Sequence, residues 1–293
     1  MPVRPSKGRA RTSPRTLATI SVNGSDRSGV VARMTLLLFE HGANIESLEE
    51  EVTRGQFHMA LQASWPVAPD RAALGSRLAA LARELGMDAR LRFADPRKPL
   101  RMAVLCTKEG EAPEALLVAC EGRRIKAEPV VVISNRKDLA PLARRHGLPF
   151  AHVPWTHGAR AEARALKLLD EHDVDFLTLA RFMRILSPAF VWRWRNRIIN
   201  IHPSLLPSFP GAASYRQAWE HGVRVVGVTA HFVTPGLDEG PIIAQDAFRV
   251  RASDPLAEIQ RKGRALEGRV VVEAVRLYAE KRLDVHWGRV HEG

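Results

Sequence analysis

The sequence predicts an α/β protein with two domains, a small α+β domain followed by a larger one built on a mostly parallel, doubly wound sheet. Two observations lead to this prediction. Residues 16–95 follow the order strand, helix, strand, strand, helix, strand, whereas from residue 100 onward apolar runs alternate with helical patterns. The segment Asp95-Pro96-Arg97-Lys98-Pro99 separates the two regions as a linker. The predicted domains are residues 16–95 and 100–293, and a disordered basic tail precedes them at residues 1–15.

The first domain has the element order of the ferredoxin-like fold. Its expected elements are strand 17–22, helix 30–41, strands 45–53 and 56–64, helix 70–85 and strand 89–93. A turn containing Asp26 and Gly29 opens the first helix, where free backbone amides favour carboxylate ligands. Asp26 therefore either caps this helix or helps to hold a small effector, and we favour the cap.

The second domain repeats strands and helices. Its expected strands are 102–106, 130–134, 150–153, 176–180, 198–201 and 225–233, and its expected helices are 113–121, 138–146 and 161–172. Runs that are apolar throughout are typical of parallel strands covered on both faces. Asp254 and Pro255 predict the start of a last long helix, which runs through residues 261–282 with a weak point at Gly263 or Gly268.

Composition favours a small anionic ligand over nucleic acid. The formal net charge is +12, and five of these charges lie in the tail, at Arg4, Lys7, Arg9, Arg11 and Arg15. The other arginines are interspersed with acids, and we find no zinc-finger, homeodomain-like or RNP-type motif. No apolar run approaches the roughly 18 residues that cross a bilayer. The sequence therefore predicts neither nucleic-acid nor membrane partners.

The cysteine content indicates a reducing, cytoplasmic environment. The chain has only Cys106 and Cys120, which is too few for a disulfide scaffold. Their spacing is not that of a metal site, so we expect both to be packing residues.

Polar side chains follow two strands of the second domain. Asn200 and His202 share a face of strand 198–201 because side chains two residues apart point the same way, and Pro203 ends the strand. Asp238 lies in a loop rich in Gly and Pro after strand 225–233. A donating amide, an imidazole that donates or carries a proton, and a carboxylate that takes one suit acyl transfer through a tetrahedral oxyanion. We therefore expect Asn200, His202 and Asp238 to be catalytic.

Each of these residues also has an ordinary structural alternative. A terminal Asn can bond to its own backbone, a lone His is more often a buried packing residue, and loop 234–241 can be a tight connection. His202, His231 and Asp238 also have the donor types of a two-histidine, one-carboxylate metal site. We prefer acyl transfer without a metal because it also explains Asn200, and His231 then orients the catalytic groups through a hydrogen bond.

Three segments together resemble the folate-dependent formyltransferase fold. They are Asn200-Ile201-His202-Pro203-Ser204, the loop Leu237-Asp238-Glu239-Gly240-Pro241 and Leu179-Ala180-Arg181-Phe182-Met183-Arg184-Ile185-Leu186. The turn from Gly24 to Gly29 and the corner Gly42-Ala43-Asn44-Ile45 resemble an ACT domain. Joined in this order, the two domains resemble the formyltetrahydrofolate deformylase family over nearly the whole chain apart from the tail.

The resemblance implies a function and a binding site. It implies hydrolysis of 10-formyltetrahydrofolate to formate and tetrahydrofolate in one-carbon metabolism and purine biosynthesis, with the folate as substrate and no prosthetic group. Asn200 and His202 would stabilise the oxyanion while Asp238 assists proton transfer. The pocket for the pterin ring would be bordered by Met183, Arg184, Ile185, Leu186, Thr234 and Leu237. The ACT-like domain implies a homo-oligomer and a possible small-molecule effector.

The acceptor of the formyl group is the open alternative. The loop after the first strand of the second domain, residues 106–113, has one Gly and two acids, which makes a poor cradle for a nucleotide phosphate. Water is therefore the expected acceptor. Pro203 stands where the resembling deformylases commonly have a second histidine, so transfer of the formyl group to an unidentified amine is the alternative.

Overall fold

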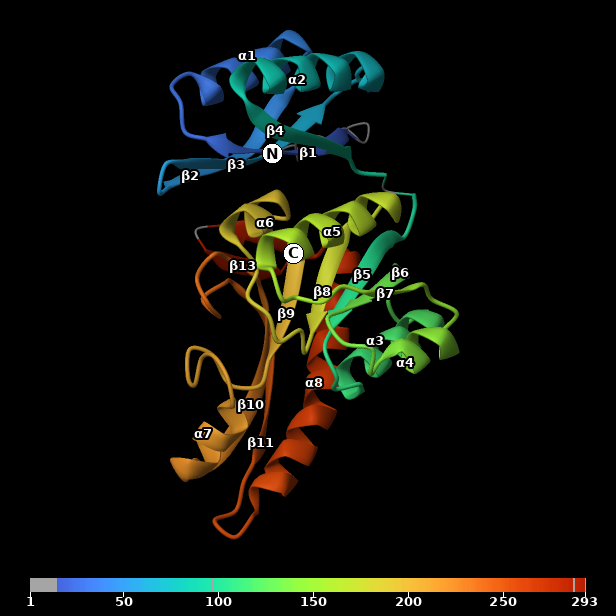
Figure 1. Cartoon of the computed structure of the whole chain (residues 1–293), viewed down its shortest axis with the longest axis vertical. Coiled ribbons are helices and arrows are strands. Elements are labelled where there is room, and N and C mark those ends of the chain that lie inside the picture. The colour runs from blue at the N-terminus through green and yellow to red at the C-terminus, as the bar shows by residue number, and fades with distance from the viewer. Residues whose placement is uncertain (1–14, 96, 287, 293) are drawn as a thin grey trace, which may run out of the picture. The chain divides into compact units, whose positions relative to one another are not determined.

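The chain forms two compact units, Met1–Pro96 and Arg97–Gly293, in a computed structural model that describes residues 15–95, 97–286 and 288–292 (Figure 1). The boundary lies within the segment Asp95–Pro99. The predicted tail at residues 1–15 lies outside the described residues except for Arg15. Each unit has a hydrophobic core of its own.

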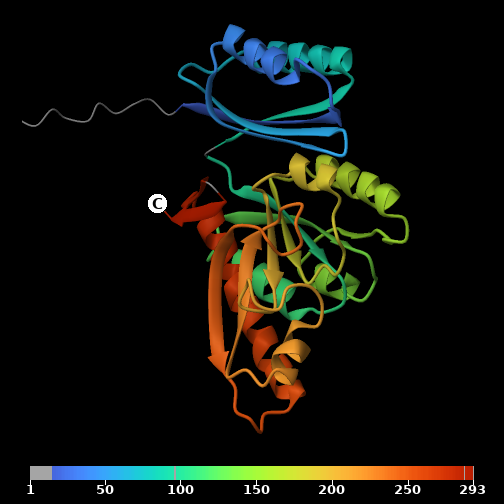
Figure 2. The same cartoon turned by 90° about the vertical axis from the view of Figure 1, so that its left-hand side faces the viewer.

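The first unit, as far as it is described, is a four-stranded antiparallel sheet with two helices over one face (Figure 2). Its elements are β1 (Thr16–Ser25), α1 (Val30–Glu40), β2 (Asn44–Thr53), β3 (Gln56–Trp65), α2 (Arg71–Leu85) and β4 (Met87–Phe93). The strand order is β2-β3-β1-β4. This arrangement confirms the predicted ferredoxin-like order.

Helix ends in this unit follow local chemistry, with one correction. The Asp70 carboxylate accepts hydrogen bonds from the backbone N–H groups of Ala72 and Ala73, both at 3.0 Å, and starts α2 as predicted. The preferred cap at Asp26 is wrong, because the N-cap of α1 is Gly29 at φ +86° and no side chain caps that helix. A residue with a Cβ is disfavoured at this φ, which explains the glycine.

In the main described sheet of the second unit, five neighbouring strands are parallel to one another. The first elements of this unit are β5 (Leu100–Cys106), α3 (Glu111–Glu121), β6 (Ala127–Ser134), α4 (Ala140–Arg145), β7 (Phe150–His152), α5 (Gly158–Glu171), β8 (Phe176–Ala180), α6 (Pro188–Arg193) and β9 (Ile198–His202). The later elements are α7 (Ser214–Glu220), β10 (Val225–Phe232), β11 (Ile242–Arg249), α8 (Leu256–Ala279), β12 (Leu283–His286) and β13 (Arg289–Glu292). Strand β10 pairs antiparallel with β9, the last of the five parallel strands, and β11 pairs antiparallel with β10. The strand order is β11-β10-β9-β8-β5-β6-β7, which confirms a mostly parallel sheet.

Helices cover both faces of this sheet (Figures 1 and 2). One core cluster joins the sheet to α3, α4 and α8, and another joins it to α5 and α6. The residues of β5 from Met102 to Cys106 are fully buried, as expected for a strand covered on both faces. The chain proceeds from β5 to β6 on one side of the sheet and from β8 to β9 on the other, so the strand order reverses between β5 and β8. Open α/β sheets bind ligands at the carboxyl ends of the strands near such a reversal.

The last long helix differs from the prediction in two ways. Asp254 does not cap it; its carboxylate accepts a hydrogen bond from the Arg251 N–H and pairs with Lys262. The helix also continues unbroken through Gly263 and Gly268. A Cβ at these positions would meet Tyr215 and Ala115, so the two glycines allow close packing instead of weakening the helix. None of the helices in the described ranges combines the length and apolar composition that a membrane span needs.

Candidate active site

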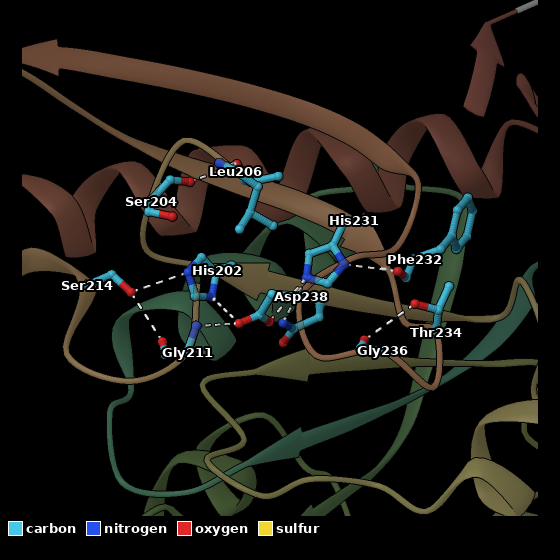
Figure 3. Close-up of polar contacts among 12 residues, drawn as sticks. His202, Ser204, Leu206, Gly211, Ser214, His231, Phe232, Thr234, Gly236 and Asp238 are labelled. Atoms are coloured by element: carbon cyan, nitrogen blue, oxygen red, sulfur yellow. Dashed lines mark hydrogen bonds and ion pairs between the residues drawn. The ribbon is translucent and has the colours of Figure 1, made fainter. Parts of the chain in front are cut away.

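The three predicted catalytic side chains line one cavity at the carboxyl end of β9. Figure 3 shows the Asp238 carboxylate between His202 and His231. Asn200 and His202 lie on β9, and Asp238 lies in the loop between β10 and β11. His202 Nδ1 is 3.2 Å from Asp238 Oδ2. Antiparallel pairing of β9 with β10 places His231 opposite Asn200, with 3.1 Å between Asn200 Nδ2 and His231 Nε2.

His231 fixes the orientation of the Asn200 amide. The carbonyl oxygen of Phe232, 2.9 Å from His231 Nδ1, can only accept, so Nδ1 carries the proton. Burial is the main cause that lowers the pKa of His231, and the neutral ring leaves Nε2 as an acceptor. Asn200 therefore donates one amide N–H to Nε2 and retains a second N–H for a ligand.

His202 and Asp238 lie side by side, and each has further polar partners. His202 Nε2 lies 3.0 Å from the carbonyl oxygen of Phe209 and 3.2 Å from the Ser214 hydroxyl, so this nitrogen donates. The other ring nitrogen, Nδ1, faces Oδ2 of the Asp238 carboxylate. The backbone N–H of Gly211 donates to the same Asp238 oxygen at 2.8 Å. The second oxygen of Asp238, Oδ1, stays out of these bonds and lies 3.7 Å from His231 Nε2.

The loop that carries Asp238 depends on close backbone approach. Asp238 has a φ of +56°, and the Phe232 N–H donates to the Pro241 carbonyl at 2.9 Å. A Cβ at Gly240 would lie 1.6 Å from the Phe232 oxygen, so only glycine fits there. Loop 234–241 is thus a tight connection, as one alternative predicted, and it also directs its carboxylate toward β9.

A cavity of about 590 Å³ contains the site. Its lining includes the three catalytic candidates and all the residues predicted to border the pterin, namely Met183, Arg184, Ile185, Leu186, Thr234 and Leu237. Met183, Ile185 and Leu237 are exposed apolar side chains, whereas Leu186 is buried and also belongs to the core. Apolar walls with a few convergent polar groups are typical of small-molecule sites.

Several residues of the site were not predicted from the sequence. Phe209 and Gly211 act through backbone groups, and Ser214 through a hydroxyl at the start of α7. Arg181 and Tyr215 also line the cavity. Backbone contributions depend on the path of the loop from residue 203 to residue 213, for which the sequence has no periodic signal. Arg181 lies within the motif at residues 179–186, but the motif alone did not predict a role for this side chain.

The metal alternative is not supported by the donor geometry. In the ranges that the structure describes, no group of three or more His, Cys, Asp or Glu side chains is arranged to hold a metal ion. Instead, the three side chains of that alternative form hydrogen bonds with backbone groups. His202 bonds to the Phe209 carbonyl, His231 to the Phe232 carbonyl and Asp238 to the Gly211 N–H.

Comparisons with known proteins agree with this architecture. The formyl transferase family profile matches residues 100–275, and the ACT domain profile matches residues 16–92. The chain is 37% identical over 271 residues to a formyltetrahydrofolate deformylase of Bacillus subtilis (strain 168), covering 90% of each chain. It is 39% identical over 268 residues to a formyltetrahydrofolate deformylase of Mycobacterium bovis, covering 89% of this chain and 86% of the relative.

Solved structures include a deformylase and a transferase. The crystal structure of a formyltetrahydrofolate deformylase from Pseudomonas syringae matches with a TM-score of 0.66 and 31% identity, over 96% of this chain and 95% of that one. The crystal structure of glycinamide ribonucleotide transformylase 1 from Symbiobacterium toebii matches with a TM-score of 0.64 and 39% identity, over 69% of this chain and 97% of that one. The similarity to the deformylase extends over both domains.

Proposed function

Because the chain belongs to the formyltetrahydrofolate deformylase family, we propose that it hydrolyses 10-formyltetrahydrofolate to formate and tetrahydrofolate. The observation that supports this most is the meeting of Asn200, His202 and Asp238 in one cavity of suitable size. The folate is the substrate, and the chemistry requires no prosthetic group. The apolar loops at residues 182–186 and 233–237 are proposed to hold the pterin ring.

Asn200 is the proposed oxyanion donor. Water attacks the formyl carbon, and negative charge develops on the formyl oxygen as the tetrahedral intermediate forms. The amide N–H that His231 leaves unused is oriented in advance to donate to that oxygen. His202 lies beside Asp238 and the Phe209 carbonyl, and it is proposed to support the oxyanion electrostatically.

Asp238 is the proposed proton carrier. Its oxygen Oδ1 accepts a proton from the attacking water, while Oδ2 stays fixed by Gly211 and His202. When the intermediate collapses, the bond from the formyl carbon to N10 breaks and N10 takes a proton from the pair of Asp238 and His202. The pair has then gained one proton from water and given one to N10, so it is back in its starting state. Formic acid loses its own proton to solvent, and the products are formate and tetrahydrofolate.

Release of formate in the absence of an amine tests the proposal. Purified protein is incubated with 10-formyltetrahydrofolate alone, and formate and tetrahydrofolate are measured. We expect equal amounts of the two products. Consumption of the substrate only after an amine is added would instead establish the transferase alternative. The similarity to a transformylase structure is the reason to test this alternative.

The first domain is proposed to join subunits into a homo-oligomer. The profile match identifies it as an ACT domain. In that domain, Leu36 and Phe39 of α1 are 54% and 75% exposed, and Val52 of β2 is 48% exposed. Exposed apolar side chains on a helix and on the edge strand β2 suit pairing with a second copy. We further propose that a small effector binds this domain near Asp26, and that the protein acts in the cytoplasm, where the buried cysteines Cys106 and Cys120 stay reduced.

A further inference from the structure

Part of the cavity lining has no role in hydrolysis as proposed. Arg181, Tyr215 and Gln260 form this part, and they come from the residue after β8, from α7 and from α8. The loops proposed to hold the folate form a different part of the lining. A nucleophile must reach the formyl group through space that the folate does not fill. We call the part of the lining formed by Arg181, Tyr215 and Gln260 the acceptor end of the cavity.

A buried ion pair forms the wall of the acceptor end. Arg181 Nε lies 3.6 Å from Glu267 Oε2, and the Tyr215 hydroxyl donates to Glu267 Oε1 at 2.7 Å. Only 2% of the Glu267 side chain and 16% of the Arg181 side chain are exposed. Burial raises the pKa of the Glu267 carboxyl, and the charge of Arg181 opposes this effect. A carboxylate this deeply buried needs its cation, so Arg181 is held in place.

The backbone is adapted to these side chains at two positions. Arg181 has a φ of +61°, a region that residues with a side chain seldom adopt. A Cβ at Gly263 of α8 would lie 2.2 Å from Cζ of Tyr215, so the ring packs against this helix only because position 263 is glycine. The backbone conformation at Arg181 and the glycine at position 263 thus both accommodate large side chains in this part of the cavity wall.

The same region lies where open α/β sheets bind phosphorylated ligands. Arg181 directly follows β8, and α3 follows β5, which is the parallel neighbour of β8 in the sheet. Glu111 stands in the first turn of α3 and pairs with Arg264 at 3.5 Å, so the helix start carries an acid rather than a free cation. A phosphorylated amine would meet this carboxylate together with an arginine already paired to Glu267.

We propose that Arg181, fixed by Glu267 and Tyr215, is the residue that reserves the acceptor end for water. The inference rests on the proposed hydrolysis and explains its choice of acceptor. In either reaction a nucleophile bonds to the formyl carbon, the bond to N10 breaks, and N10 takes a proton. Water fits beside the guanidinium, whereas an amine with substituents overlaps the space filled by Arg181 and Tyr215. Arg181 therefore determines specificity without taking part in proton transfer.

The test measures how the formyl group divides between water and added amines. The variant Arg181→Gly combined with Glu267→Gln removes the guanidinium and leaves no unpaired buried charge, and the glutamine oxygen still accepts from Tyr215. Glycinamide serves as the probe, and formate, the formylated amine and tetrahydrofolate are measured. The wild type should give formate alone. The variant should increase the formylated amine at least roughly tenfold over the uncatalysed background.

Two further variants make the result decisive. Tyr215→Ala opens the same wall from the other side and should also increase the formylated amine. Arg264→Ala removes a neighbouring cation that does not line the cavity and should give formate alone. Folded variants of Arg181 and Tyr215 that yield only formate, or that lose both reactions, would overturn the inference. Failure of the wild type to release formate without an amine would instead refute the proposed hydrolysis.

Discussion

At the scale of single residues, the amide of Asn200 is the group on which the proposed chemistry depends most directly. His231 orients this amide through a bond of 3.1 Å, so one N–H is ready to stabilise the oxyanion. We expect Asn200→Ala to lower kcat by about a hundred- to a thousandfold, the usual effect of losing one such donor. Formate release measures the loss, and an unchanged melting temperature would show that the fold is intact. A variant with nearly wild-type kcat would contradict the role of Asn200.

His231 also predicts a specific dependence of stability on pH. Burial lowers its pKa below the ordinary value of 6.5, so the folded protein keeps it neutral while the unfolded chain takes up a proton near that pH. Its contribution to folding is therefore complete above about pH 6.5 and declines below it, by at most about 1.4 kcal/mol per pH unit for one proton. Urea unfolding of the wild type and His231→Gln from about pH 7.5 down to about pH 5.5 measures the difference.

The wild type should lose more stability than His231→Gln over this pH range. The exposed His221, changed to glutamine, provides the matched control and should behave as the wild type does. Parallel pH profiles for the wild type and His231→Gln would show that burial of His231 is not linked to protonation in this range.

The sequence was sufficient to predict that Asn200, His202 and Asp238 lie close together, because they lie at a strand end and in a loop marked by Gly and Pro. It was not sufficient to predict how they are held. The proton positions on His202 and His231 follow from carbonyl groups of Phe209 and Phe232, and their directions depend on loop geometry. Arg181 was missed for a related reason, since its partner Glu267 is distant in sequence and lies inside a helix.

At the scale of elements, the loop between β10 and β11 sets the position of Asp238. Gly240 packs so closely on the end of β10 that a Cβ would lie 1.6 Å from the Phe232 oxygen. Gly240→Ala should therefore displace the loop and separate Asp238 from His202. We expect kcat/KM to fall by about a hundredfold, as a shift of the order of 1 Å in a reacting group does.

Gly236→Ala is the matched control for this loop. Its added Cβ would meet the end of the flexible Glu239 side chain, which can move away. We expect this variant to keep most of its activity when formate release is measured. Equal losses of activity in Gly240→Ala and Gly236→Ala would contradict this explanation. They would show that the contact with the Phe232 oxygen is not what makes the loop sensitive to alanine.

Two glycines inside helices should respond to alanine in opposite directions. Gly75 in α2 has open space around its Cβ position, so Gly75→Ala should stabilise the protein by about 0.5–1 kcal/mol. Gly263 in α8 packs against the Tyr215 ring, so Gly263→Ala should destabilise it by about 1–3 kcal/mol. Urea unfolding measures both, and a stabilising Gly263→Ala would show that the ring moves without penalty.

Elements with strong periodicity were predictable, and those defined by packing were not. The apolar runs of β5, β6, β8 and β9 and the order of elements in the first domain follow from local pattern. The short helices α6 and α7 and the exposed strand β11 lack such a pattern and were missed. Gly263 and Gly268 suggested a weak helix because the sequence does not reveal that Tyr215 and Ala115 lie against them.

At the scale of the whole molecule, the division into two units separates two proposed roles. Every residue that lines the cavity belongs to the second unit, and the first unit has its own core around Val22, Met59 and Leu74. Subunit association is proposed for the first unit alone. The two roles should therefore separate when the chain is divided between its units.

Deletion of residues 1–95 tests this separation. Because the second unit retains its two core clusters and the complete cavity, we expect the truncated chain to release formate within about tenfold of the full-length rate. Light scattering should give an oligomer for the full chain and a monomer for the truncated chain. The full chain carrying Phe39→Asp provides a second measurement, since it places a charge on the exposed apolar surface of α1 without removing the domain. Oligomers of unchanged mass in both variants would place the subunit interface outside the ACT domain.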